Sequence, residues 1–343
     1  MNRISTVAAV SVMISASVLP ANATAIDIAS TFPEDMIFLG DGLKSFKESL
    51  EAISAGETTV NIHGAGELVP ALEVLNGVST GAVSAGYDWV GYWGGTIPVA
   101  NLIGSLPFGP PPEVLAEWIW EGGGLEIVQK AYDPHNIKFL PCVIVPAEPA
   151  GWFRKEINTV EDLQGLRFRI GGLAGRALTK VGVSPQLIPG GEVFVALERG
   201  RIDAAEFSLP TIDVTLQLQT AADYYYFPGW HQPSSINSIT FNKGFWDGLT
   251  ELEQTQITAA CRSSFLWTMT SAVQQQAETL SQLEEGGTQI KRFPDEVLAA
   301  LRTATDEVIA EERANDPIFD EAYQSLTAHI DSRARWNELQ SLD

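Results

Sequence analysis

Short apolar runs alternate along this chain with longer stretches in which apolar residues recur at helical spacing. The runs at 26–30 and 59–63 predict strands, and the stretch 36–55 between them predicts a helix. The same reasoning predicts further strands and helices at 139–145, 236–242, 69–76 and 192–199. This alternation of strands with helices predicts an α/β architecture.

The longest helical pattern covers residues 250–285. Thr250 and Glu253 have the spacing of a capping box, and no proline or glycine follows before Gly286. A continuous helix of roughly 34 residues would be about 50 Å long at a rise of 1.5 Å per residue. Because that length exceeds the width of a small domain, we expect the helix to run along two lobes. Two helices joined by a kink are the alternative.

The N-terminus has the pattern of a secretory signal peptide over residues 1–25. A basic start at Arg3 precedes an apolar run at 4–19, and Ala23-Thr24-Ala25 matches a cleavage site. The run is too short and too interrupted by serine to span a bilayer well, although an uncleaved anchor is the alternative. A formal net charge of −22 argues against nucleic acid as a partner, because phosphates would repel the protein.

The cysteines and histidines give little indication of a metal site. Cys142 and Cys261 could pair in an oxidising compartment, but a sequence cannot show their proximity, and two buried free thiols are the favoured interpretation. The chain has no C-x-x-C motif, and its four histidines are scattered. The sequence therefore does not predict a zinc site.

The candidate site residues lie where the expected strands end. Arg169 closes the run 166–170, Glu206 closes a short strand after Gly200, and Glu148 follows the strand at 139–145. A buried guanidinium needs an anion, and ligands of open α/β sheets bind beyond the carboxyl ends of strands. These residues predict a site for a small charged molecule. The alternative is that Arg169 pairs with Glu206 or lies on a solvated face.

Two aromatic clusters and the carboxylates refine this prediction. The segments 87–95 and 224–233, which include Trp89, Tyr92 and Trp230, either line a pocket or belong to the core. Two carboxylates with backbone carbonyls are hard oxygen ligands that suit Ca²⁺ or, less demandingly, Na⁺.

Motifs of catalysis are missing from the sequence. The chain contains no G-x-S-x-G elbow, H-E-x-x-H pair or P-loop. Two glutamates near aromatic residues would suffice for a glycosidase, so a secreted hydrolase using Glu148 and Glu206 is an alternative. Arg169 between them fits that chemistry poorly. A ligand-sensing domain is a third interpretation.

Six segments together resemble the solute-binding proteins of tripartite ATP-independent periplasmic (TRAP) transporters, of the DctP type. The resemblance is strongest to the subgroup that binds 2-oxo and 2-hydroxy acids, and it covers nearly the whole mature chain. It rests on residues 65–70, 106–109, 151–153, 163–175, 200–206 and 226–230.

The resemblance implies a role for each candidate residue. Arg169 matches an arginine that clamps the ligand carboxylate with two parallel hydrogen bonds. The metal ligands would be the carboxylate of Glu206, the backbone carbonyl of Phe207, Glu148 in place of a glutamine, and Gln232. Trp89, Tyr92 and Trp230 complete the expected substrate-binding set. The extra charge of Glu148 favours a divalent ion, and Phe207, a tryptophan in some relatives, leaves the ligand size open.

The resulting prediction is a two-lobed periplasmic-binding-protein-like α/β fold with a ligand cleft between the lobes. Lobe 1 would comprise 26–147 and 237–265, and lobe 2 would comprise 148–236 and 266–293, with the helix 250–285 shared. Residues 294–343 would pack outside as helices. Such a protein is not an enzyme. It would bind a small organic acid and a metal ion in the periplasm and deliver the acid to TRAP membrane permease subunits, as a monomer or a homodimer.

Overall fold

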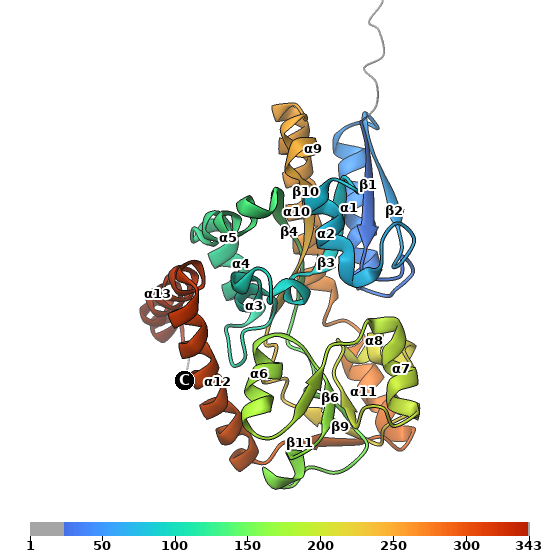
Figure 1. Cartoon of the computed structure of the whole chain (residues 1–343), viewed down its shortest axis with the longest axis vertical. Helices are drawn as coiled ribbons and strands as arrows, with labels where there is room; N and C mark the ends of the chain where they lie inside the picture. Colours follow the sequence, from blue (N-terminus) through green and yellow to red (C-terminus); the bar gives the residue numbers. More distant parts are fainter. Residues whose placement is uncertain (1–23, 342–343) are drawn as a thin grey trace, which may run out of the picture.

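The computed structural model describes residues 24–341, which form two mixed β-sheets surrounded by helices (Figure 1). The α/β fold predicted from the sequence is confirmed. Most of the predicted signal peptide, residues 1–23, lies outside the described residues, whereas Thr24 and Ala25 begin the first strand. No helix within residues 24–341 combines the length and apolar character needed to cross a membrane.

The first sheet has the order β2-β1-β3-β10-β4. Strands β1, β2 and β3 are parallel, with Ile28 beside Ala85, and β10 runs antiparallel to both β3 and β4. A register shift interrupts the pairing of β10 with β4 between Asn237 and Ser238. The strands are β1 (Thr24–Ser30), β2 (Thr58–His63), β3 (Ala85–Trp89), β4 (Ile137–Val145) and β10 (Ser235–Asn242).

The second sheet has the order β11-β9-β5-β8-β6-β7, with β5 antiparallel to its neighbours β8 and β9. Gly151 opens β5 at φ +121°, and an added Cβ would lie 2.6 Å from the carbonyl oxygen of Ala205, so only glycine allows this close pairing. The strands are β5 (Gly151–Phe153), β6 (Arg167–Arg169), β7 (Ser184–Gln186), β8 (Ala204–Ala205), β9 (Tyr224–Phe227) and β11 (Gln289–Arg292).

Helix α1 (Leu39–Ile53) and helix α10 (Glu251–Ser271) pack on each other and against β4. Leu39, Leu43, Phe46 and Leu50 of α1 recur at spacings of three and four residues and are buried, which explains why this stretch forms an amphipathic helix. The other helices that follow strands of the first sheet are α2 (Val74–Thr80), α3 (Pro98–Gly104), α4 (Pro112–Glu121), α5 (Gly124–Tyr132) and α9 (Lys243–Asp247).

The second sheet is accompanied by α6 (Gly172–Lys180), α7 (Gly190–Glu198), α8 (Pro210–Thr215) and α11 (Gln276–Glu285). The chain passes between the sheets through residues 146–150, 228–234 and 272–275. Short 3₁₀ turns occur at η1 (Ala71–Glu73), η2 (Val90–Trp93), η3 (Asp133–His135), η4 (Glu161–Leu163) and η5 (Leu218–Thr220). The exact lobe boundaries given above stay a prediction.

The expected continuous helix over 250–285 is divided into two helices, so that prediction was wrong. The capping box of Thr250 and Glu253 is present, but α10 ends at Ser271 and Gln275 adopts the left-handed conformation at φ 67°. Gln276 then exchanges hydrogen bonds with Thr211 at the start of α8. The break therefore coincides with tertiary contacts to helices of the second sheet. No proline or glycine in the local sequence marks its position.

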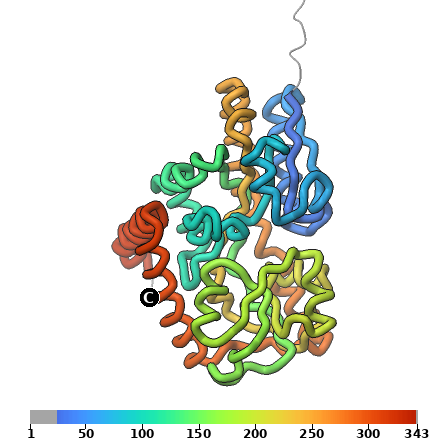
Figure 2. The backbone as a smooth tube through the Cα atoms, viewed as in Figure 1, coloured from blue at the N-terminus to red at the C-terminus, as the bar shows by residue number. Residues whose placement is uncertain are grey.

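Two C-terminal helices, α12 (Asp295–Asn315) and α13 (Pro317–Gln340), run along one side of the molecule (Figure 2). Helix α12 packs on α6, whereas α13 packs on α5 and α3. Arg176 and Lys180 of α6 form ion pairs with Glu311 and Glu312 of α12. The C-terminal segment therefore contacts helices of both sheets.

A disulfide joins Cys142 of β4 to Cys261 of α10. The favoured expectation of two free thiols was wrong. The bond links positions 119 residues apart, and both residues are fully buried where α10 crosses β4. Only the packing of that helix on that strand brings the two sulfur atoms together, so the sequence could not reveal the pair.

Candidate ligand and metal site

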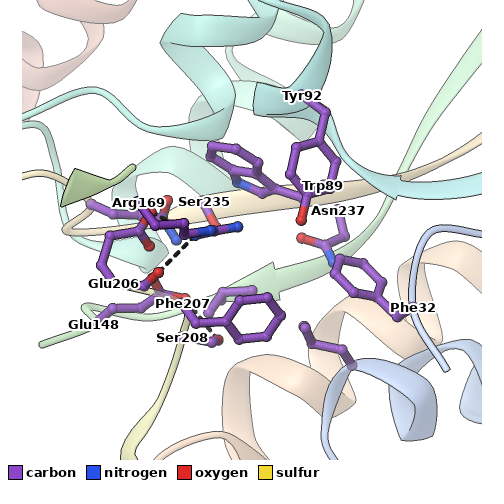
Figure 3. Close-up of a pocket in the computed structure, with 13 residues that line it drawn as sticks. Phe32, Trp89, Tyr92, Glu148, Arg169, Glu206, Phe207, Ser208, Ser235 and Asn237 are labelled. Carbon is purple, nitrogen blue, oxygen red and sulfur yellow. Dashed lines mark hydrogen bonds and ion pairs between the residues drawn. The ribbon is translucent and has the colours of Figure 1, made fainter. Parts of the chain in front are cut away.

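A small cavity of about 350 Å³, including its opening to solvent, lies between the two sheets. Both sheets and the segments that link them supply its walls (Figure 3). The lining residues are Phe32, Leu39, Trp89, Tyr92, Val145, Glu148, Arg169, Glu206, Phe207, Ser208, Gln232, Ser235 and Asn237. So small a space suits a ligand of few atoms.

Strand ends bring the charged residues together. Arg169 is the last residue of β6 and pairs in register with Ala205 of β8, so Glu206 follows directly beside it. Glu148 comes three residues after β4, in the first link between the sheets. This placement agrees with the general rule that ligands bind beyond the carboxyl ends of strands.

Arg169 is held by both side-chain and backbone acceptors. Its Nη1 donates to Oε1 and to the carbonyl oxygen of Glu206, at 2.7 Å each, and its Nε donates to the carbonyl of Ile188 at 3.2 Å. The Phe207 ring lies 5.1 Å from the guanidinium carbon, in cation–π contact. The structure therefore contains the Arg169–Glu206 ion pair of the alternative interpretation, and the same guanidinium lines the cavity.

Glu148 and Glu206 are both buried beside the cavity. Glu148 Oε1 accepts a hydrogen bond from Ser208 Oγ at 2.8 Å, while its Oε2 has no hydrogen-bond partner among the described residues. Burial, and then the charge of Glu206, raises the pKa of Glu148 well above its usual range. Burial also raises the pKa of Glu206, although Arg169 acts in the opposite direction. Two carboxylates this close repel each other when both are ionised, and a cation or a proton between them would relieve that repulsion.

The structure adds His231, which the sequence did not predict as a residue of the site. Its Nε2 lies 3.8 Å from Glu206 Oε2 and 4.0 Å from Glu148 Oε2. Burial, followed by the charge of Arg169, lowers the pKa of His231 to about 3, so the imidazole is neutral. Its position next to Gln232 in the second link was the one sequence signal, and it was too weak to separate this histidine from the other three.

The other predicted residues divide into two groups. Trp89, Tyr92, Phe207 and Gln232 line the cavity. Trp230 is not among the residues that line it, and its place in the site stays a prediction. The Trp230 ring packs instead against Phe108, with a centroid distance of 5.6 Å, because the backbone of Phe108 donates to the carbonyl of Trp230 and fixes the two segments together.

Several lining residues were missed, among them Phe32, Ser208, Ser235 and Asn237. Ser235 and Asn237 alternate with Ile236 on β10, so one face of this strand supplies polar groups to the cavity. That alternation was visible in the sequence. The other two residues lie in loops, whose side-chain directions follow from the fold.

A fold of two sheets around a small buried cavity, with a guanidinium and two carboxylates in its wall, defines a binding protein for a small charged solute. A family model described as bacterial extracellular solute-binding protein, family 7 (DctP), matches residues 30–315, and the chain belongs to this family. The protein is thus an extracytoplasmic solute receptor of a TRAP transporter and not an enzyme. The hydrolase alternative finds no support.

Relatives and solved structures agree with this family. A monocarboxylate 2-oxoacid-binding periplasmic protein of Nostoc sp. is 33% identical over 301 residues, which cover 88% of this chain and 83% of that protein. A TRAP transporter solute-binding protein of Bordetella bronchiseptica, with copurified calcium and picolinate, has a TM-score of 0.89 at 29% identity, covering 93% of this chain and 95% of the other. One from Colwellia psychrerythraea with calcium and pyruvate has a TM-score of 0.87 at 31% identity, with coverages of 92% and 97%. One from Pseudoalteromonas atlantica with sodium and pyruvate has a TM-score of 0.88 at 30% identity, again with coverages of 92% and 97%.

Proposed function

We propose that this protein captures a small 2-oxo or 2-hydroxy monocarboxylate in the periplasm, together with a metal ion, and delivers the acid to TRAP permease subunits. The observation that carries the proposal is the burial of Arg169, Glu148 and Glu206 at one cavity. The 2-oxoacid-binding relative from Nostoc and the pyruvate-bound structures support it. A signal peptide over residues 1–25 and a homodimer remain predictions.

The cavity wall supports a ligand with one carboxylate. Arg169 is the only lysine or arginine among the described residues that line the cavity, so one carboxylate can be matched by a fixed cation. A guanidinium can donate parallel hydrogen bonds to both oxygens of that carboxylate. Phe32, Leu39 and Val145 form apolar wall, which suits a short hydrocarbon group at the other end of the ligand.

The residues also fit a metal ion. Glu148 Oε2 is buried without a hydrogen-bond partner among the described residues, and a cation would satisfy it while offsetting the repulsion from Glu206. Glu148, Glu206, the backbone carbonyl of Phe207 and Gln232 would hold the ion. When bound, it would supply a positive charge that chelates the carboxylate and the 2-oxo or 2-hydroxy oxygen of the acid. Ca²⁺ is the first choice and Na⁺ the second, as in the solved relatives.

Calorimetry on metal-depleted protein tests the proposal. Pyruvate is titrated into protein that has been chelated and exchanged into sodium-free buffer, and then into the same protein with Ca²⁺ or Na⁺ restored. We expect binding with a restored ion and a loss of at least about tenfold in affinity without it, which corresponds to about 1.4 kcal/mol. Equal affinity without either ion would remove the metal from the proposal. No binding of any 2-oxo or 2-hydroxy acid under all conditions would overturn the function itself.

A further inference from the structure

Asn237 carries a buried oxygen at the cavity for which the described residues provide no hydrogen bond. It is the third residue of β10, it lines the cavity, and 1% of its surface is exposed. Its Oδ1 has no hydrogen-bond partner among residues 24–341. Buried polar groups in folded proteins are nearly always satisfied, so Oδ1 requires a partner that the polypeptide does not supply.

A neighbouring phenol determines which end of the Asn237 amide is left without a partner. Tyr87 is fully buried, and its hydroxyl donates to the carbonyl oxygen of Leu39 at 2.9 Å. Because a phenol has one hydrogen, the same hydroxyl can only accept from Asn237. Asn237 Nδ2 therefore faces Tyr87 and donates to it at 3.4 Å. The remaining amide atom, Oδ1, is an acceptor, so the partner that it lacks must be a hydrogen-bond donor.

Asn237 lies across the cavity from the charged residues. Figure 3 shows Arg169 and Glu206 on one side of the cavity, and Asn237 with Phe32 and Tyr92 on the other. The Tyr92 hydroxyl makes no hydrogen bond to Oδ1, since Oδ1 has no partner among the described residues. A solute whose carboxylate is bound by Arg169 would therefore extend toward Asn237, and its far end would meet the free oxygen.

The spacing along β10 matches a short acid. Ser235 Oγ is also buried, also without a hydrogen-bond partner among the described residues, and lies on the Arg169 side of the cavity in Figure 3. Ser235 and Asn237 are two residues apart on one face of the strand, which separates them by about 6.6 Å. An acid of three carbons, with one hydrogen bond at each end, spans this length.

We propose that Asn237 selects acids with a hydroxyl group on C3, so that the preferred solutes are 3-hydroxylated 2-oxo or 2-hydroxy acids rather than pyruvate or lactate. This inference rests on the proposed function, because it names the substrate class of the same site. The proposed ion would hold the oxygen on C2, so the donor for Asn237 has to come from the next carbon. A methyl group there would leave Oδ1 buried without a partner, which lowers affinity. Sites that hydrogen-bond a solute hydroxyl discriminate strongly against analogues that lack it.

Calorimetry on the full chain, with Ca²⁺ or Na⁺ restored, tests the selection with two pairs of acids. Pyruvate is paired with 3-hydroxypyruvate and L-lactate with L-glycerate, so that each pair differs only by the hydroxyl on C3. We expect the hydroxylated member of each pair to bind at least about tenfold more tightly, which corresponds to about 1.4 kcal/mol. 3-Fluoropyruvate should bind no more tightly than pyruvate, because fluorine cannot donate a hydrogen bond. This comparison uses wild-type protein and does not depend on the folding of a variant.

A substitution then assigns the selection to Asn237. Asn237→Leu replaces the amide by an apolar group of similar size, and the affinity ratio within each pair should fall below about threefold because the hydroxyl loses its acceptor. Thr240→Val is the matched control. Thr240 lies on the same strand, donates to the carbonyl of Gly86 and does not line the cavity, so this variant should keep the wild-type ratio.

The outcomes separate this inference from the function on which it rests. Equal affinities within each pair in the wild type would overturn the selection and leave a receptor for simple acids intact. A gain from fluorine as large as the gain from the hydroxyl would also overturn it, because hydrogen bonding would then not be the cause. A wild-type ratio in Asn237→Leu, or an equal loss of the ratio in Thr240→Val, would remove Asn237 from this role. Absence of binding of all five acids with either ion would overturn the proposed function as well.

Discussion

Arg169 pairs with the carboxylate of Glu206, and we propose that it also binds the carboxylate of the solute. Its Nη1 already donates to Glu206, and the guanidinium also lines the cavity. Burial is what gives the residue its importance, because an ion pair excluded from water costs several kcal/mol when one member is removed.

We therefore predict that Arg169→Ala abolishes measurable binding, with a loss of at least about 100-fold, and that Arg169→Lys is nearly as poor because an ammonium cannot form the paired hydrogen bonds. Calorimetry with the preferred acid measures both. Arg167→Ala is the control, since Arg167 lies two residues earlier on β6 and pairs with Asp203 in a half-exposed position. Affinity within threefold of wild type in either Arg169 variant would contradict the clamp.

Asp88 should make the stability of the protein depend on pH. It is fully buried on β3 and accepts a hydrogen bond from Ser238, and burial raises the pKa of Asp88 to about 7. In the unfolded chain the pKa of aspartate is about 3.9. Between these values the folded protein binds the proton that the unfolded chain has lost, so the contribution to stability is complete below about pH 4 and is lost as the pH rises through about 7.

In the wild type, the free energy of unfolding should fall between about pH 4 and pH 7 because of Asp88. The Asp88→Asn substitution should make this fall smaller by up to about a few kcal/mol. Urea denaturation at a series of pH values measures this, with Asp331→Asn on the exposed face of α13 as control. An unchanged pH profile in Asp88→Asn would show that Asp88 is ionised in the folded protein.

The sequence predicted the charged residues of the site better than its neutral ones. Arg169, Glu148 and Glu206 follow expected strands, and the rule for strand ends places them at a common edge. His231 was not predicted as a site residue, because its approach to the two carboxylates depends on how the segment 228–234 passes between the sheets. The place of Trp230 in the site stays a prediction, since its ring packs on Phe108 in a contact that joins distant parts of the chain.

At the scale of elements, the strands and most helices follow from local patterns, whereas their interruptions and links do not. The capping box at Thr250 fixes the start of α10. The end of α10 cannot be predicted from the local sequence, because the contact between Gln276 and Thr211 depends on the packing of the second sheet's helices. The disulfide between β4 and α10 is unpredictable in the same way.

That disulfide supports a prediction about stability. Closing a chain separation of 119 residues restricts the unfolded state, and such bonds typically stabilise by about 2–5 kcal/mol. Replacing both Cys142 and Cys261 by alanine should lower the free energy of unfolding by that amount while leaving ligand affinity within about threefold, because neither residue lines the cavity. Chemical denaturation and calorimetry measure the two effects. A denaturation midpoint equal to that of the oxidised wild type would contradict the prediction.

At the scale of the whole molecule, the cavity is built by both sheets, so one bound solute contacts both halves of the protein. The chain segments 146–150, 228–234 and 272–275 are the places where backbone rotation could separate the halves. Closure about such links is a common response of two-lobed receptors to their ligand.

We predict that the preferred acid decreases the radius of gyration of metal-loaded protein, as measured by small-angle scattering. The Arg169→Ala variant with the same acid is the control, since it should retain the ligand-free profile. Identical scattering of the wild type with and without saturating acid would indicate a rigid receptor.

A crystal structure of the protein grown with pyruvate and Ca²⁺ would test the proposed binding mode most directly. We predict that the carboxylate of pyruvate contacts the guanidinium of Arg169, and that a cation bound by Glu148 and Glu206 also contacts the 2-oxo oxygen. Pyruvate bound away from Arg169, or bound in the cavity without any cation between the two glutamates, would contradict the proposed binding mode.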